Sequence, residues 1–343
     1  MNQLETLRNK KSVSDWLTAA GIACAADILE IASGGNNRVY KVSGETGTFL
    51  LKQYFFHPMD KRNRLKAEFD FLSYIWKRGI RVVPQPISCN EENHLGLYEF
   101  VSGTSFIPGS VSRDDLDMAQ SFLLRLNEDR KNAISIVGNA SEACFSVQAH
   151  LACVEERINK VTEIVGETPI DQEARTFVIE KLVPEWTRIK RFIQNEAAGW
   201  LEYSLKIGER CLSPSDFGFH NAIRQPNRGI RFIDFEYAGW DDPAKLVCDF
   251  FCQVKVPVDS EELAPFVEGI SGMSDQPTFF SDRVHWLLPA YQIKWCCIVL
   301  NEFLPVSLLR RRFADGSGSD IARKQNQLEK AKQFLKRATS IGL

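Results

Sequence analysis

Three side chains that carry oxygen atoms lie around one short stretch of the sequence. Asn221 follows Asp216 by five residues, and Asp234 follows Asn221 by thirteen. Between Asn221 and Asp234, two apolar runs flank a turn at residues 226–229, which is typical of a β-hairpin. Such a hairpin would bring the three side chains to one of its ends. Carboxylate and amide oxygens bind Mg²⁺, which often takes its other ligands from substrate phosphates, so the pattern indicates phosphoryl transfer.

This stretch resembles the catalytic and metal-binding loops of the aminoglycoside phosphotransferase and choline kinase family, the small-molecule relatives of protein kinases. The resemblance depends on the spacing of Asp216 and Asn221 and on the sequence Ile233-Asp234-Phe235 after the hairpin. It implies that Asp216 orients and deprotonates the hydroxyl of an acceptor. It also implies that Asn221 and Asp234 hold Mg²⁺.

The catalytic loop departs from the family pattern at two positions. Many relatives have His-Gly-Asp at the catalytic aspartate, whereas Pro214 stands here at the place of the histidine, and Gly218 replaces a second histidine that often follows. Proline fixes φ and donates no backbone hydrogen bond, so the loop needs other contacts to hold it. His220 is new to the pattern, and we expect a structural hydrogen-bonding role because Asp216 already fills the position of the base.

The elements that must position these groups begin near the N-terminus. Residues 28–32 and 38–42 are strand candidates, and a turn with two adjacent glycines separates them. Kinases use such a turn to place backbone N–H groups over nucleotide phosphates, although ordinary hairpins also contain glycines. The sequence Gly-Gly-x-Asn is similar to that of the small-molecule kinases. The resemblance assigns four residues of the turn to the nucleotide site: Gly34, Gly35, Asn36 and Asn37.

A lysine and a glutamate occupy positions with apolar neighbours. In a third predicted strand, residues 48–54, Lys52 shares a face with Leu50, either as a gatekeeper of an edge strand or as a cation directed at phosphate. In a predicted helix over residues 61–78, Glu68 lies among apolar positions and needs a partner. An ion pair between a strand lysine and a helix glutamate belongs to the kinase fold, so we expect Lys52 to pair with Glu68.

Two short strands are predicted next, over residues 80–87 and 95–101, and Gly103 ends the second. The segment around the second strand resembles the kinase hinge, whose backbone contacts adenine. The resemblance therefore implies nucleotide contacts for Glu99 and Val101, while an ordinary strand and loop remains the alternative.

The hinge divides the predicted fold. We expect an N-terminal nucleotide-binding lobe at residues 1–102 and a C-terminal catalytic and substrate-binding lobe at residues 103–343. The fold class is α+β, a two-lobed protein-kinase-like fold with a small antiparallel sheet and one helix in the first lobe and mainly helices in the second.

Helical periodicity dominates after residue 111, where Ser112 and Asp115 are spaced as in a capping box. Asp249 lies in an apolar helix and must be hydrogen-bonded or paired; in the family a similar aspartate steadies the catalytic loop. Glu236 has two open interpretations, a contact with a second cation or with a cationic acceptor.

Several aromatic residues fall on one predicted helix near the C-terminus. Their spacing fits either core packing or an aromatic cage of the choline-binding kind. They are His285, Trp286, Tyr291 and Trp295.

Composition excludes several classes of protein. The 343 residues include 25% charged residues with a net charge of -2, which does not favour a nucleic-acid or anionic membrane surface. The nine cysteines are odd in number and include no Cys-x-x-Cys pair, which fits a reducing cytosol. No apolar run has the length of a transmembrane helix, and the N-terminus is polar. We therefore expect a cytoplasmic protein.

The predicted function is transfer of the γ-phosphoryl group of ATP or GTP, with Mg²⁺, to a hydroxyl of a small molecule. An acid-lined pocket would suit an aminoglycoside, an aromatic cage choline, and a mixed polar pocket a sugar or amino alcohol; the sequence offers candidates for each. The alternative is a catalytically silent nucleotide-binding relative that acts through protein contacts. Pro214 leaves that alternative open, whereas the retained set of Lys52, Glu68, Asp216, Asn221 and Asp234 argues against it.

Overall fold

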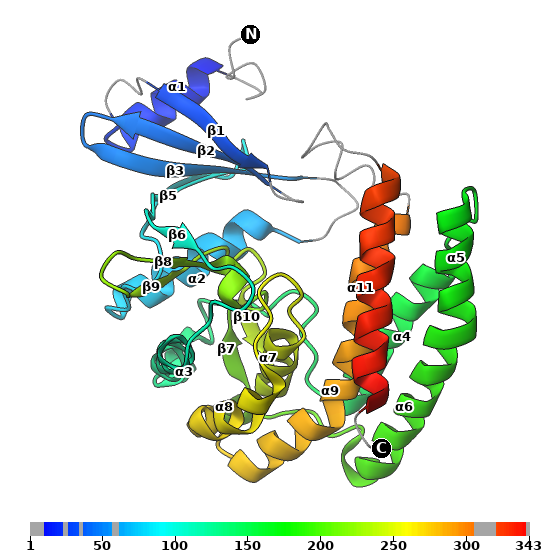
Figure 1. Cartoon of the computed structure of the whole chain (residues 1–343). Helices are drawn as coiled ribbons and strands as arrows, with labels where there is room; N and C mark the ends of the chain where they lie inside the picture. The colour runs from blue at the N-terminus through cyan, green and yellow to red at the C-terminus, as the bar shows by residue number, and fades with distance from the viewer. Residues whose placement is uncertain (1–9, 23–26, 34–36, 57–61, 305–319, 341–343) are drawn as a thin grey trace.

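The chain folds into a β-rich lobe and a larger, mainly helical lobe (Figure 1). The computed structural model describes residues 10–22, 27–33, 37–56, 62–304 and 320–340. An antiparallel sheet of five strands in the order β1-β2-β3-β5-β4 forms the first lobe. The predicted α+β architecture, with a small antiparallel sheet and a larger helical lobe, is therefore confirmed.

The sheet of the N-terminal lobe is covered by a helix on each face. Val13 and Leu17 of α1 pack against Tyr40 and Val42 on one face, while α2 packs against the other. The two helices contact different sets of strand residues, because successive side chains of a strand point to opposite faces of the sheet. The elements are α1 (Lys10–Ala19), β1 (Asp27–Ser33), β2 (Asn37–Gly44), β3 (Gly47–Tyr54), α2 (Arg64–Lys77), β4 (Pro86–Asn90) and β5 (Leu95–Glu99).

The sequence pattern predicts a first helix over residues 14–21, with Ser14 as its cap and Gly21 as its end. Helix α1 begins at Lys10, so Ser14 lies inside it. Val13 and Leu17, one turn apart, are both buried and fix the helix face. Gly21 has a φ of 86° and ends the turn after the helix, as its residue type predicts.

Residues 80–85 are not the strand that their alternation predicts. Strand β4 starts only at Pro86, and Pro84 has no N–H to give to a ladder. The carbonyl of Val82 instead accepts a hydrogen bond of 2.8 Å from the backbone N–H of Phe232. The segment therefore joins the two lobes.

Helices form most of the C-terminal lobe, and Ser112 and Asp115 form the predicted capping box at the start of α3. Short strands lie near the lobe interface, where β6 pairs with β8, β8 with β9, and β7 with β10. The strands are β6 (Thr104–Ser105), β7 (Cys211–Ser213), β8 (Ala222–Arg224), β9 (Ile230–Phe232) and β10 (Gly239–Asp241). The helices are α3 (Arg113–Asn127), α4 (Val147–Thr162), α5 (Pro169–Phe177), α6 (Val183–Glu196), α7 (Pro243–Phe251), α8 (Leu263–Gly269), α9 (Pro277–Leu300) and α11 (Asp320–Ser340).

The sequence pattern predicts one helix over residues 172–197. The structure instead has α5, a π-helical turn (Val178–Leu182) and then α6. Pro184 is the second residue after the turn and cannot donate the usual backbone hydrogen bond. The extra residue in the π-helical turn accommodates this loss, and the two helices stay in one continuous rod (Figure 1).

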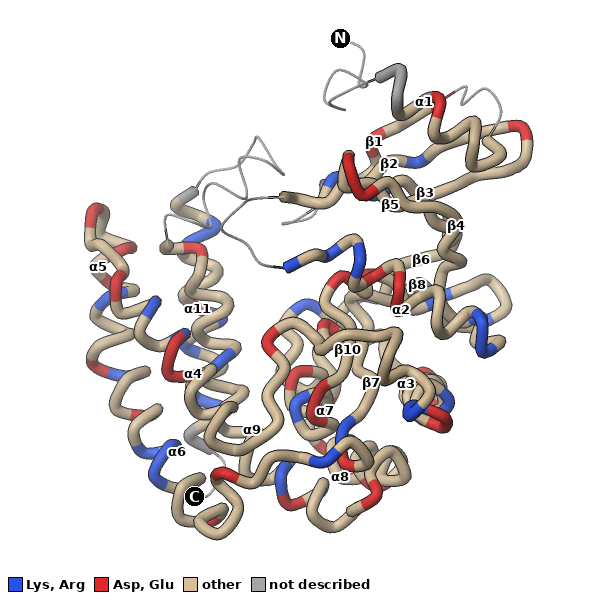
Figure 2. The backbone as a smooth tube through the Cα atoms, turned by 180° about the vertical axis from the view of Figure 1, so that it is seen from behind, with Lys and Arg blue, Asp and Glu red and all other residues tan. Residues whose placement is uncertain are grey.

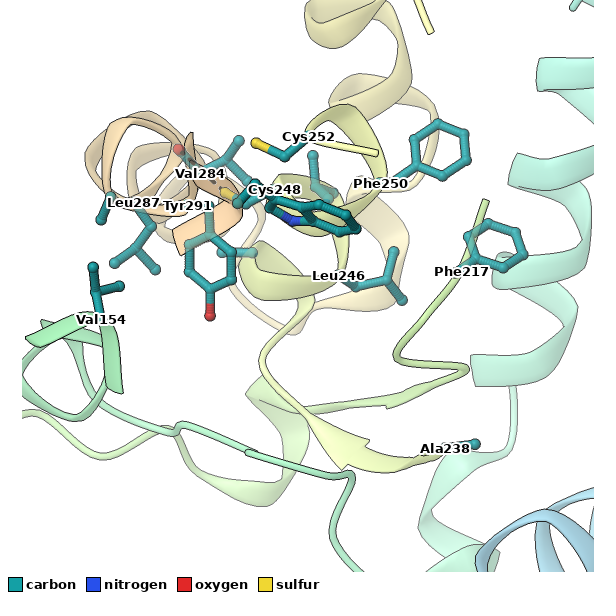
Figure 3. Close-up of a cluster of buried hydrophobic side chains, with 14 of the residues drawn as sticks. Val154, Phe217, Ala238, Leu246, Cys248, Phe250, Cys252, Val284, Leu287 and Tyr291 are labelled. Carbon is teal, nitrogen blue, oxygen red and sulfur yellow. Dashed lines mark hydrogen bonds between the residues drawn. The ribbon is translucent and has the colours of Figure 1, made fainter. Parts of the chain in front are cut away.

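The buried face of α7 packs against α9 (Figure 3). Asp249 accepts hydrogen bonds of 3.0 Å from Lys294 and 2.9 Å from Trp295. Asp249 is thus paired, as its burial required, but its partners are on α9. Asp249 therefore connects α7 to α9, which is a structural role.

The aromatic residues of α9 contribute to the core. Tyr291 is buried, and its hydroxyl lies 2.7 Å from Nδ1 of His150. The Trp295 indole is directed at Asp249, whereas His285 is exposed and meets the ring of Phe192 edge-on. These separate partners support the core-packing interpretation.

Charged residues of both signs are interspersed along the C-terminal helices (Figure 2). This distribution agrees with the near-neutral net charge. Within the described ranges, none of the helices combines the length and apolar character needed to cross a membrane.

Gly103 lies where the hinge meets the hairpin and is expected to be sensitive to substitution. Its φ is +150°, and an added Cβ would lie 2.4 Å from the carbonyl oxygen of Arg224. Gly103→Ala should lower the free energy of unfolding by about 1–3 kcal/mol, measured by denaturant titration. Gly109→Ala is the matched control because Gly109 also has a positive φ but has open space around it. Equal losses in the two variants would mean that backbone conformation, and not the close contact, limits Gly103.

Candidate active site

Lys52 connects the two lobes through two ion pairs. Its Nζ lies 2.7 Å from Oε2 of Glu68 and 2.6 Å from Oδ1 of Asp234. Lys52 and Glu68 are buried, so the predicted ion pair between them is present. Burial lowers the pKa of Lys52, but the charges of Asp234, Glu68 and Glu236 outweigh it and hold that pKa well above its usual value. The ammonium group is therefore permanently charged at neutral pH.

Two tyrosines that the sequence analysis missed complete the environment of Glu68. The Tyr54 hydroxyl donates a hydrogen bond of 2.6 Å to Oε2 of Glu68 and lies 2.8 Å from the Tyr98 hydroxyl. Lys52 pairs with Gly96 across the sheet, and the Tyr98 hydroxyl lies only 2.5 Å from where a Cβ on Gly96 would be. The sequence could have predicted that Tyr54 lies beside Lys52, because residues two positions apart in a strand share a face.

The predicted hairpin is formed by β8 and β9. Ala222 pairs with Phe232, and the Ile233 N–H donates a hydrogen bond of 2.9 Å to the carbonyl of Asn221. Asn221 and Asp234 therefore lie at the same end of the hairpin. Asp234 has a φ of 67°, unusual for a residue with a side chain, and this conformation directs its carboxylate to Lys52. The Asp234 side chain remains 36% exposed despite this ion pair.

Asp216 lies beside Asn221 in the loop between β7 and β8. The Asn221 amide donates a hydrogen bond of 3.0 Å to the backbone carbonyl of Asp216 and lies 3.4 Å from its Oδ2. Burial raises the pKa of Asp216, but contacts with His220 outweigh that effect and bring the pKa below its usual value. Its side chain is 39% exposed, so an ionised carboxylate at this site can still meet a ligand.

The end of α3 holds the strand that leads into this loop. Asn127 accepts a hydrogen bond of 2.7 Å from the Leu212 N–H and donates one of 3.0 Å to the Leu212 carbonyl. The asparagine amide thus makes both bonds that a neighbouring strand would make. It contributes to holding a loop that has Pro214 in place of the family histidine.

Asn37 and Glu236 form a second contact between the lobes. The Asn37 amide donates a hydrogen bond of 2.7 Å to Oε2 of Glu236, and both side chains are buried. Burial and then the charge of Asp234 raise the pKa of Glu236. The structure thus gives Glu236 a partner from the N-terminal lobe. Gly34, Gly35 and Asn36, the rest of the predicted phosphate loop, lie outside the described residues.

The predicted hinge lies between the sheet and the hairpin. The Glu99 carboxylate pairs with Arg231 at 2.6 Å and accepts a hydrogen bond of 3.1 Å from the Gln85 N–H. These contacts occupy the side chain of Glu99 and tie the end of β5 to β9. Val101 follows in the same connection, two residues before Gly103.

The groups at the end of the hairpin suit a hard cation. Asn221 uses its amide nitrogen toward Asp216, so its oxygen is the atom left for a metal, and Asp234 supplies a carboxylate. Within the described part of the chain, no cluster of three His, Cys, Asp or Glu side chains could hold a metal without other ligands. The donor set therefore fits a Mg²⁺ ion that takes further ligands from phosphates.

Two cavities lie away from these groups. One, of about 520 Å³, is between α8 and α9 and is lined by residues such as Val267 and Leu288. The other, of about 350 Å³, is between α3 and the β8–β9 hairpin, beside Phe232. Neither is lined by Asp216 or Asp234, so we assign the site from the positions of its charged groups.

The hydroxyl of Tyr54 should contribute measurably to the buried ion pair. Tyr54→Phe removes the hydrogen bond to Glu68, and bonds to buried charged groups stabilise by about 1.5–3 kcal/mol. We expect a loss of that size in the free energy of unfolding. Tyr74→Phe is the control because the Tyr74 hydroxyl donates only to a backbone carbonyl, at 3.2 Å. A loss no larger than in the control would contradict a special role for Tyr54.

Known proteins are similar to this chain both in part of its sequence and in its fold. Residues 27–134 match the model of the phosphotransferase enzyme family, and no curated protein matches the sequence. The fold is similar to choline kinase from Cryptosporidium parvum Iowa II, with a TM-score of 0.61, 13% identity and coverage of 97% of each chain. A spectinomycin phosphotransferase in complex with ADP and spectinomycin has a TM-score of 0.62 at 12% identity, with 96% of this chain and 97% of that chain covered. A choline/ethanolamine kinase family protein from Mesorhizobium loti has a TM-score of 0.60 at 14% identity, with 95% and 94% covered.

The family match covers the sheet, the hinge and α3, whereas the catalytic and metal-binding loops lie beyond it. The solved structures cover nearly the whole chain at low identity and therefore establish the fold. The predicted resemblance is confirmed: the chain has the two-lobed fold of the small-molecule kinases, and over residues 27–134 it has the sequence pattern of the phosphotransferase enzyme family.

Proposed function

We propose that this protein transfers the γ-phosphoryl group of ATP, or of GTP, to a hydroxyl of a small molecule. The observation that carries the proposal is the position of Lys52, whose ammonium group lies between Glu68 of the N-terminal lobe and Asp234 of the metal loop. A buried lysine between two carboxylates is a fixed cation at the boundary of the lobes. It suits a phosphate chain that has to be held beside a metal.

Each residue has a distinct part in the proposed reaction. Glu68 orients Lys52, which binds the nucleotide phosphates, while Asn221 and Asp234 hold Mg²⁺. When bound, the Mg²⁺ ion neutralises negative charge on the phosphates during transfer. Asp216, ionised at neutral pH, accepts the proton of the acceptor hydroxyl. Catalysis comes mainly from positioning and charge neutralisation.

Asn37 connects the phosphate loop to the metal loop in this proposal. Its bond to Glu236 ties the first residue of β2 to the chain two residues after Asp234. Gly34, Gly35 and Asn36 are proposed to bind the nucleotide phosphates. The backbone of Glu99 and Val101 is assigned to the adenine edge, at the boundary between a nucleotide-binding lobe at 1–102 and a catalytic lobe at 103–343.

The similar structures support the type of substrate. One of them contains ADP and spectinomycin, and others are named as choline or ethanolamine kinases. A small alcohol is therefore the proposed acceptor. An acid-lined pocket for an aminoglycoside and a mixed polar pocket for an amino alcohol or sugar remain candidates, while the core packing of the α9 aromatic residues argues against a cage built from them.

Two measurements test the function. The first is the thermal shift caused by ATP or GTP, with and without Mg²⁺, since binding to the native state raises the melting temperature. The second is phosphorylation of a panel of aminoglycosides, choline, ethanolamine, sugars and hydroxy amino acids. Transfer to one acceptor, dependent on Mg²⁺, is the expected result. Tight nucleotide binding without transfer to any acceptor or to water would favour a silent binding protein instead.

A further inference from the structure

The space beside Gly218 is filled by the imidazole ring of His220. An added Cβ on Gly218 would lie 2.9 Å from Nδ1 and 3.2 Å from Cε1 of that ring. The backbone at Gly218 is extended, with a φ of 165°, so alanine could adopt it. The ring, and not the conformation of the chain, is therefore what excludes a side chain at position 218.

The same ring contacts the carboxylate of Asp216. Nε2 of His220 lies 3.2 Å from Oδ1 of Asp216, and the histidine side chain is only 4% exposed. A carboxylate can only accept a hydrogen bond, and Nε2 is the ring nitrogen that faces it. Nδ1 is buried and has no hydrogen-bond partner among the described residues. Asp216 is thus one polar side chain that approaches Nε2 of the buried ring, and Gln253 is another.

Gln253 confines the ring from the side of α7. Its Nε2 lies 3.1 Å from Nε2 of His220, and its own oxygen accepts a hydrogen bond of 2.9 Å from the Lys255 N–H. Gln253 is itself buried just after the end of α7. The backbone bond fixes the amide, which in turn limits rotation of the imidazole ring.

Aromatic packing fixes the loop backbone, while side-chain contacts set the direction of the Asp216 carboxylate. Phe217 stacks on Phe250 with ring centres 5.5 Å apart, and Phe219 lies 5.8 Å from the same ring (Figure 3 shows Phe217 and Phe250). These contacts hold the residues on either side of Gly218. The contact of His220 with Oδ1, together with the Asn221 amide 3.4 Å from Oδ2, then sets the plane of the carboxylate.

We propose that His220, confined by Gln253, is a positioning residue that holds Oδ1 of Asp216 so that Oδ2 faces the acceptor hydroxyl. The imidazole takes the space that a side chain at position 218 would otherwise fill. This inference rests on the proposed function, since it assigns His220 to the base of the phosphoryl transfer. Misplacing a reacting group by about 1 Å can lower a rate by about 100-fold.

Variants at positions 218 and 220 test whether His220 positions Asp216. His220→Ala should lower kcat by about 10- to 100-fold while the KM for nucleotide changes by less than about 3-fold. His220→Gln should recover a large part of kcat, because a glutamine amide nitrogen can reach the position of the histidine Nε2. A purely structural role predicts no such recovery and equal losses in kcat and in nucleotide affinity.

Gly218→Ala provides a sharper control. In the presence of His220 the added methyl group must displace the ring, so kcat should fall. In a His220→Ala background the same methyl group meets no ring, so it should have no further effect. Additive losses in the double variant would overturn the proposed contact between positions 218 and 220.

The melting temperature of each variant shows whether it is folded, and the thermal shift with Mg²⁺ and ATP shows whether the nucleotide site is intact. If wild-type protein transfers phosphate but His220→Ala keeps full kcat, the positioning role is wrong and the proposed function stands. If wild-type protein neither binds nucleotide nor transfers phosphate, the proposed function itself fails. The two failures are therefore distinguishable.

Discussion

Replacing Asp234 with alanine is expected to reduce phosphoryl transfer by at least about 1,000-fold, the scale at which loss of a charge-stabilising group affects a transition state. Asp234 provides the charged oxygen of the proposed metal site, and Asn221 alone offers only a neutral amide. The variant should stay folded, because Lys52 keeps its bond of 2.7 Å to Glu68 and does not become an unpaired buried charge.

The measurements are kcat in the acceptor assay and the Mg²⁺-dependent part of the thermal shift with ATP. In Asp234→Ala, kcat should fall by the factor given above, and the Mg²⁺-dependent part of the thermal shift should be lost. Asp117→Ala is a suitable control, since Asp117 is an exposed acid on α3 that pairs only with Arg113 in the same helix. Full transfer activity in the Asp234 variant would rule out its assignment to the metal.

Replacing Asp216 with asparagine should lower kcat by about 100- to 10,000-fold, the usual contribution of a general base, with little change in nucleotide affinity. The asparagine keeps the shape of the side chain and can still meet His220, so positioning is largely retained. What is lost is the ability to accept a proton. The lowered pKa of Asp216 means that the wild-type carboxylate is already ionised at neutral pH.

The test separates turnover from binding. kcat is measured at saturating acceptor, and nucleotide affinity is measured by thermal shift. Asp259→Asn is the matched control, because Asp259 is an exposed acid that caps a short turn away from the site. Asn127→Asp would not serve, because Asn127 supports the same loop as Asp216. If Asp216→Asn lost nucleotide binding in the same proportion as kcat, Asp216 would be a binding residue and not the base.

Local patterns were sufficient to predict much of the site. Lys52 and Glu68 could be paired from sequence because each lies among apolar neighbours, and a buried charge requires a partner of opposite sign. The hairpin of β8 and β9 followed from two apolar runs around a turn, and its register fixed the relation of Asn221 to Asp234. The periodicity of apolar residues, and a charged residue among apolar neighbours, can each be recognised within a short segment. A single sequence is therefore enough to predict these features.

Contacts between distant segments were beyond such patterns. Pairing Asn37 with Glu236 requires the β1–β2 region and the metal loop to meet across the lobes. Asp249 shows the limit most clearly: its need for a partner was evident, but only the packing of α7 on α9 decided that Lys294 and Trp295 would provide it.

The sequence by itself determined the two-lobed α+β architecture, the presence of a buried Lys52–Glu68 pair and the grouping of Asp216, Asn221 and Asp234 around one hairpin. Tertiary structure alone decided how the carboxylate of Asp216 is held, because the His220 ring is positioned by Gln253, thirty-three residues further along the chain. The physical reason is that hydrophobic periodicity specifies which face of an element is buried. The direction of a polar side chain depends instead on which donors and acceptors the folded chain brings within hydrogen-bonding distance.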